Sequence, residues 1–102
     1  MGSPVIVVSK LKSESLSLVK KIAEKGLTPD IVLLSEAVYM LVDKKQYLSG
    51  VKKAIECGAR FFALSQDASK RGIEKMINDV EIIDYEGLVD LLLEKSRSVI
   101  NL

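Results

Sequence analysis

The sequence contains no histidine and no tryptophan, and Cys57 is its single cysteine. Without histidine, the chain lacks the commonest general base and the commonest metal ligand of proteins. Without a second cysteine, it cannot close an internal disulfide. Zinc sites and catalytic triads are therefore not expected, and neither is any metal or cofactor. Cys57 is the one conventional nucleophile.

Two common motifs are also missing. Neither GxGxxG nor GxxxxGK[ST] occurs, which argues against a nucleotide-binding enzyme. No apolar run approaches the roughly 20 residues that span a bilayer, and the opening MGSPVIVVSKLK does not have the apolar core of a signal peptide. We therefore expect a cytoplasmic protein without membrane contact. The formal charge of +1 gives no sign of direct nucleic-acid binding.

What is present is typical of one α/β domain covering residues 1–102. Apolar runs of strand length occur at residues 5–8, 31–34, 61–64 and 80–83, and residues 98–102 form a possible fifth strand at a sheet edge. Nearly continuous apolar runs are typical of parallel strands that are covered on both faces.

Helical spacing separates these runs. One helix is expected after the cap Ser13, a second before Gly58, a third in which Ile73, Met76 and Ile77 form a short stripe, and a fourth after the cap Asp84. The alternation predicts a three-layer α/β/α fold with a five-stranded, mainly parallel sheet.

Polar residues follow the strands, at what would be the shared carboxyl edge of a parallel sheet. The candidates for a binding edge are Ser9, Lys10, Ser35, Glu36, Tyr39, Ser65, Gln66, Asp67 and Asp84. They could bind a small anion or metabolite, with Lys10 and helix amides supplying positive potential. They could equally be helix caps and turn formers. Tyr39 could line a pocket, anchor a subunit or pack in the core.

Cys57 is expected in the last turn of the second helix. The partial negative charge of a helix C-terminus disfavours a thiolate, so the residue reads as a small, half-buried hydrophobe. Lys53 and Arg60 are nearby in sequence and could oppose that effect.

The fourth helix is more apolar than one core face requires. Tyr85, Leu88, Val89 and Leu92 would supply the core face, and Leu91 and Leu93 widen the apolar arc on both flanks. A second burial against another subunit is one explanation, with Tyr85, Leu91 and Leu93 as interface candidates. Packing against a neighbouring helix and strand is the other.

Three segments resemble the DsrH/TusB family of sulfur-relay proteins. They are LSEAVY (residues 34–39), ALSQDASKRGI (residues 63–73) and VEIIDYEGLVDL (residues 80–91). The resemblance implies a DsrE-like fold, a complex with DsrE/TusD-like and DsrF/TusC-like subunits, and indirect exchange with a TusA-like sulfur carrier. Persulfide sulfur would pass towards 2-thiouridine at the tRNA wobble position, or serve sulfur oxidation.

The resemblance also implies a missing nucleophile. DsrE/TusD-like relatives carry the sulfur-accepting cysteine at the strand end before an Arg-Gly pair, and the corresponding residue here is Leu64. Some DsrH members have a cysteine in the first helix, but the matching region here, near Val19, has none. Cys57 matches neither of these positions. The expectation is a non-catalytic subunit, with two alternatives: a sulfurtransferase or sulfur-oxidation accessory protein that uses Cys57, or a homomeric anion-binding module.

Overall fold

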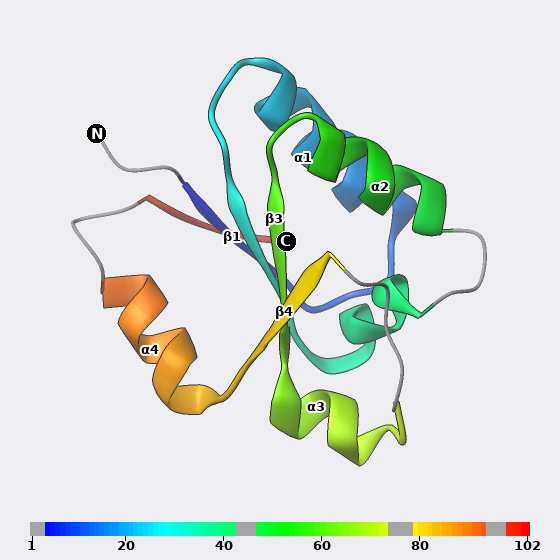
Figure 1. Ribbon diagram of the computed structural model, residues 1–102, viewed down its shortest axis with the longest axis vertical. Helices are drawn as coiled ribbons and strands as arrows, with labels where there is room; N and C mark the ends of the chain where they lie inside the picture. Colours follow the sequence, from blue (N-terminus) through cyan, green and yellow to red (C-terminus); the bar gives the residue numbers. More distant parts are fainter. Residues whose placement is uncertain (1–3, 43–46, 74–78, 94–97) are drawn as a thin grey trace.

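The computed structural model describes residues 4–42, 47–73, 79–93 and 98–102 (Figure 1). Its five strands are β1 (Val5–Val8), β2 (Asp30–Leu33), β3 (Arg60–Leu64), β4 (Val80–Ile83) and β5 (Val99–Asn101). They form one sheet in the order β4-β3-β2-β1-β5, and every neighbouring pair is parallel. The predicted five-stranded parallel sheet is confirmed, with β5 at an edge.

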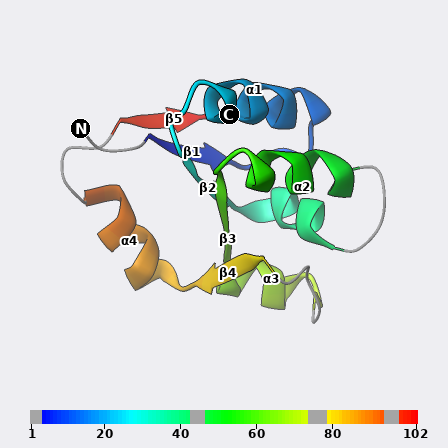
Figure 2. The same cartoon turned by 45° about the horizontal axis from the view of Figure 1, so that its top comes forward.

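Helices cover both faces of this sheet, as predicted. They are α1 (Ser13–Glu24), α2 (Leu48–Glu56), α3 (Ser65–Lys70) and α4 (Tyr85–Leu93), joined by the 3₁₀ helix η1 (Ser35–Leu41). Figure 2 shows α1 and α2 side by side on one face and α4 on the other. In the part of the chain that the structure describes, no helix has the length and apolar character needed to cross a membrane.

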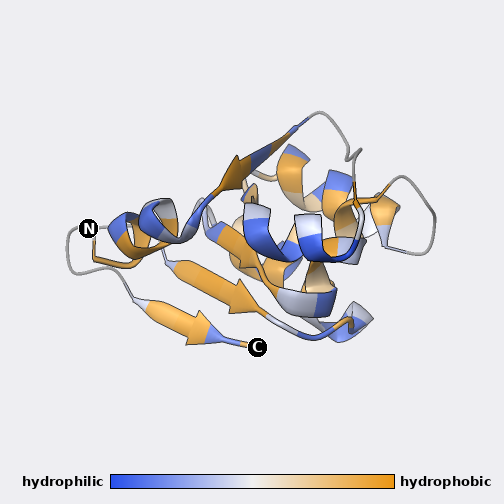
Figure 3. Ribbon diagram, turned by 90° about the horizontal axis from the view of Figure 1, so that it is seen from below, coloured by the Kyte–Doolittle hydropathy of each residue, from blue (hydrophilic) through white to orange (hydrophobic). Residues whose placement is uncertain are grey.

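Successive side chains of a strand point to opposite faces of the sheet, so the core has two parts, one on each face, and they differ in size. Ile6, Ile31 and Phe61 belong to the larger cluster, together with buried residues of α1, α2 and η1. Among the described residues, the smaller cluster has three buried members, Val5, Val32 and Phe62, against which Leu88, Leu91 and Leu92 of α4 pack. The strands are the most hydrophobic segments (Figure 3). Because the cluster under α4 is the smaller one, fewer buried apolar side chains hold the α4 face than the α1/α2 face among the described residues.

Two local predictions need correction, and one element was not predicted. Ser13 does not cap α1: it is the first helical residue, the N-cap is the extended Lys12, and no side-chain cap bond forms there. The third helix begins at Ser65, directly on the strand end, and stops at Lys70. Ile73 follows it, and Met76 and Ile77 lie outside the described residues. The 3₁₀ helix η1 was not predicted.

The fourth helix is rotated relative to the prediction. Leu88, Leu91 and Leu92 face the sheet, whereas Tyr85 and Val89 are exposed. Leu91 is therefore not surplus apolar surface, because it packs on the smaller core cluster. Leu93 is exposed as expected, and the interface role of Tyr85 and Leu93 stays a prediction.

Candidate functional site at the carboxyl edge of the sheet

The loops that follow β1, β2, β3 and β4 lie at one edge of the sheet because the strands are parallel. Lys10 follows β1, Ser35 begins η1 after β2, Ser65 begins α3 after β3, and Asp84 follows β4. This edge contains the binding candidates that the sequence indicated.

Two carboxylates at this edge join neighbouring loops. The Leu11 N–H donates to Glu36 Oε2 at 2.9 Å, so η1 is joined to the loop after β1. The Ser35 N–H donates to Asp67 Oδ2 at 2.7 Å, so α3 is joined to the loop after β2. Both bonds are charge-assisted and span more than 20 positions of sequence. These two bonds fix the positions of the neighbouring loops relative to each other.

A third carboxylate caps α4. Asp84 Oδ1 accepts the Gly87 N–H at 2.8 Å, and the Asp84 carbonyl accepts the Leu88 N–H. The predicted cap is thus confirmed. The carboxylates of Glu36, Asp67 and Asp84 each satisfy a backbone donor, which is a structural role.

Ser35 adopts a backbone conformation that serine seldom takes. Its φ of 50° lies in the left-handed region, and it is the one non-glycine residue with positive φ among those the structure describes. Such a conformation persists where surrounding contacts impose it. The short bond from its amide to Asp67 is one such contact.

Replacing Asp67 with alanine should release this loop. We expect a loss of about 1–2 kcal/mol in the free energy of unfolding, because a charge-assisted bond to a strained amide disappears. Hydrogen exchange should accelerate at the Ser35 amide in particular. Asp90→Ala, which removes an exposed carboxylate from α4, is the matched control and should leave that amide unchanged. Unchanged exchange at Ser35 in the Asp67 variant would show that the bond from Ser35 to Asp67 does not restrain this loop.

The remaining binding candidates include Lys10, Ser65, Gln66 and Tyr39. Lys10 and Gln66 are exposed, and Ser65 Oγ donates to Gln66 Oε1 at 3.1 Å. Tyr39 is the exposed residue within the otherwise buried part of η1, residues 37–41. A groove between the end of β4 and the start of α3 is lined by Ser65, Ile82, Ile83, Asp84 and Gly87. Anion binding here stays a hypothesis, and the carboxylates of this edge oppose it electrostatically. Among the described residues, no three potential metal ligands gather.

Leu64 occupies the position that the sequence indicated. It is the last residue of β3, pairs with Ile83 of β4 and immediately precedes the first residue of α3. Its side chain is 2% exposed. The predicted strand-end location is confirmed, and the side chain there is apolar and inaccessible.

Cys57 lies at the opposite edge. It is the C-cap of α2, one residue beyond the last turn where it was expected, and is half-buried against the larger core cluster. In Figure 1, α2 ends where β3 begins, and α3 follows at the far end of β3. Five residues of β3, at about 3.3 Å each, put roughly 15 Å between the two edges. The structure therefore does not bring Cys57 to the candidate site.

The ion pair between Arg60 and Asp30 was not predicted from the sequence. Arg60 donates from Nε to Asp30 Oδ1 at 2.8 Å and from a terminal nitrogen to Oδ2 at 3.0 Å. The Arg60 guanidinium also lies 5.4 Å from the centre of the Phe62 ring. A signal was available: each charged residue immediately precedes an apolar run, and in-register parallel strands place the two side by side.

Comparison with known proteins assigns the chain to a family. Residues 9–98 match the sequence profile of the family described as DsrH like protein. The chain belongs to the DsrH family. The resemblance drawn from the three sequence segments is therefore confirmed, and the matched range includes the whole carboxyl edge from Ser9 to Asp84.

Relatives of this DsrH chain agree with that assignment. It is 30% identical over 79 residues to protein TusB of Photorhabdus laumondii, covering 76% of this chain and 78% of the relative. The YchN protein of E. coli superposes with a TM-score of 0.86 at 21% identity, covering 100% of both chains. A protein of unknown function from Methanobacterium thermoautotrophicum gives 0.81 at 17% identity, again over 100% of both. At these identities the two structures establish the fold alone, and the DsrE-like α/β architecture is confirmed.

Proposed function

We propose that this chain is a non-catalytic subunit of a sulfur-relay complex that passes persulfide sulfur towards 2-thiolation of the tRNA wobble uridine. Membership of the DsrH family and the match to a TusB protein support the pathway. The proposed partners are DsrE/TusD-like and DsrF/TusC-like subunits, with a TusA-like carrier acting on the complex without direct contact to this chain.

The observation that carries the proposal is the residue at the end of β3. By the family resemblance, Leu64 corresponds to the sulfur-accepting cysteine of DsrE/TusD-like relatives, and here it ends β3 and is buried. A persulfide forms when a thiolate attacks the terminal sulfur of a donor persulfide and the donor leaves as a thiolate, which requires a thiol at the site. Leucine cannot take part, and Ser65 has no histidine to activate it.

The role left to this subunit is to hold a partner in position. Glu36 and Asp67 each hold neighbouring loops of the carboxyl edge together. The edge is therefore structured although it has no cysteine nucleophile. The exchange of persulfide sulfur would then take place on cysteines of the partner subunits and the carrier. Omission of this chain should lower thiolation because the catalytic subunits lose a binding surface, even though no thiol is removed from the pathway.

Cys57 should be dispensable. A Cys57→Ser variant in a reconstituted relay should keep the rate of 2-thiouridine formation within about twofold, with a stability loss of roughly 1 kcal/mol. The rate can be followed by mass spectrometry of digested tRNA. Serine in place of the acceptor cysteine of the DsrE/TusD-like partner is the matched control and should abolish the product.

Intact-mass analysis gives a second readout on the isolated chain. Incubation with a persulfide donor should give no adduct on residues 64–67 and at most slow labelling of Cys57. An adduct on Ser65, or loss of thiolation in Cys57→Ser with assembly intact, would overturn the proposal in favour of a catalytic subunit.

A further inference from the structure

The outer surface of α4 carries a row of exposed apolar side chains. Tyr85, Val89 and Leu93 are 55%, 50% and 77% exposed. Their spacing of four residues aligns them along one side of the helix. Because Leu88, Leu91 and Leu92 already face the sheet, this row is not needed for the core. We call Tyr85, Val89 and Leu93, with the neighbouring Glu86 and Asp90, the α4 strip.

Within residues 79–93, the segment that contains the strip, all charged side chains have one sign. Residues 79–93 contain five acidic residues, Asp79, Glu81, Asp84, Glu86 and Asp90, and no lysine or arginine. The α1/α2 face carries the opposite excess, with exposed or half-exposed lysines at positions 12, 20, 21, 25, 52 and 53. The segment 79–93 is therefore acidic, although the total formal charge of the chain is +1.

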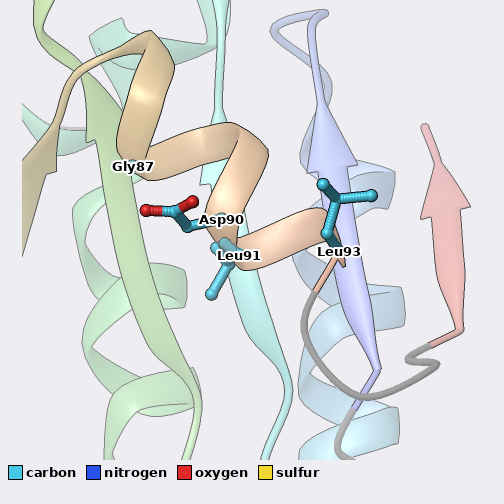
Figure 4. Close-up of a pocket in the computed structure, with 4 residues that line it drawn as sticks. All are labelled: Gly87, Asp90, Leu91 and Leu93. Atoms are coloured by element: carbon cyan, nitrogen blue, oxygen red, sulfur yellow. The ribbon is translucent and has the colours of Figure 1, made fainter.

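A groove runs beside the strip. Gly87, Asp90, Leu91 and Leu93 line it. Figure 4 shows the side chains of Asp90 and Leu93 extending to different sides of α4, with Leu91 between them. Apolar walls next to a carboxylate suit a lysine or arginine side chain, whose aliphatic stem packs on the leucines while its charge reaches the acid.

The apolar row and its acidic border favour one kind of binding partner for the α4 strip over the others. Pairing of the strip with the same strip of a second copy would bring Glu86 and Asp90 close to their own equivalents, which like charges disfavour. An anionic membrane surface is disfavoured for the same reason. A protein surface with apolar side chains bordered by lysine and arginine satisfies both the apolar row and the acidic border.

We propose that the α4 strip is the docking surface for a partner subunit with an apolar, basic-rimmed contact face, one of whose cationic side chains enters the groove at Asp90. The inference rests on the proposed function, since it takes that partner to be another subunit of the relay complex. A helix of nine residues is only about 13 Å long, so the contact should be modest in affinity and sensitive to salt.

The test uses the full chain and its purified partner subunits, with affinity measured by sedimentation or calorimetry. Leu93→Asp and Asp90→Lys should each weaken binding at least tenfold at low salt. The defect of Asp90→Lys should shrink at 0.5 M NaCl, whereas that of Leu93→Asp should remain. Leu18→Asp, at an exposed leucine on α1, is the matched control and should change affinity less than twofold. Circular dichroism should be unchanged in all three variants.

Several results would overturn the inference. They are normal assembly of both strip variants, loss of assembly only in Leu18→Asp, a wild-type chain that binds neither partner, or a homodimer or vesicle complex that depends on Leu93. The proposed function fails separately. A relay that runs equally well without this chain refutes the function even if the strip binds a partner, and a relay that needs the chain but tolerates both strip variants refutes only the docking surface.

Discussion

Replacing Phe61 with alanine should lower the free energy of unfolding by about 3–5 kcal/mol. Among the described residues, Phe61 is the largest fully buried side chain, and it lies in the larger core cluster, on the face of β3 that α1 and α2 cover. Truncation removes the ring from an apolar site and leaves a cavity that close-packed neighbours fill only in part. Domains of this size are stable by roughly 5–15 kcal/mol, so much of the total would be lost.

Urea unfolding followed by circular dichroism measures this loss. Tyr85→Ala is the matched aromatic control, because its ring is mostly exposed on α4. It should lower the stability of the isolated chain by less than about 1 kcal/mol. Similar losses in the two variants would contradict the division between core and surface described above.

The ion pair between Arg60 and Asp30 should respond asymmetrically to substitution. The Asp30 side chain is 3% exposed and that of Arg60 61% exposed. Arg60→Met keeps much of the aliphatic stem but leaves a buried carboxylate without its guanidinium. Because Arg60 is itself solvated, we expect about 2–4 kcal/mol rather than the full penalty for breaking a buried pair.

Asp30→Asn should be milder, at about 1 kcal/mol, because the cation left behind is already in water. Lys20→Met removes the exposed pair between Lys20 Nζ and Glu24 Oε2, 3.7 Å apart, and should change stability by less than about 0.5 kcal/mol. Thermal or urea unfolding of the three variants gives the ranking. A larger loss in Asp30→Asn than in Arg60→Met would show that burial of the carboxylate does not govern the pair.

The strands were predictable because their signal is local. The runs at residues 5–8 and 80–83 coincide with β1 and β4, and the others with β2 and β3 within one residue. A run of branched apolar side chains bounded by polar residues indicates a covered strand whatever its neighbours are. Their parallel arrangement followed from the helices between them.

The rotation of α4 was not predictable in the same way. Its sequence YEGLVDLLL offers two overlapping apolar arcs, one through Leu88, Leu91 and Leu92 and one through Tyr85, Val89 and Leu93. Spacing alone does not choose between them. Contact with Val5, Val32 and Phe62 decides, and those residues are distant in sequence.

The site was predictable in position but not in detail. Parallel strands fixed which loops share an edge, and the resemblance singled out Leu64. The bonds from Leu11 to Glu36 and from Ser35 to Asp67 depend on how adjacent loops lie against each other. No local pattern encodes that arrangement, so Glu36 and Asp67 looked like ordinary turn residues.

The position of β5 has a consequence for how the protein is made. β1 pairs with β2 on one side and with β5 on the other, and the second pairing joins Val5 to Val99 across nearly the whole chain. The Leu102 N–H donates to the Val7 carbonyl at 2.8 Å, and the Val5 N–H to that of Ser98 at 2.8 Å. Contacts so distant in sequence form only against a large loop-closure entropy. During synthesis, the outer edge of β1 stays open until residues 99–101 leave the ribosome, and a nascent chain arrested before them would present an unpaired apolar strand that favours aggregation.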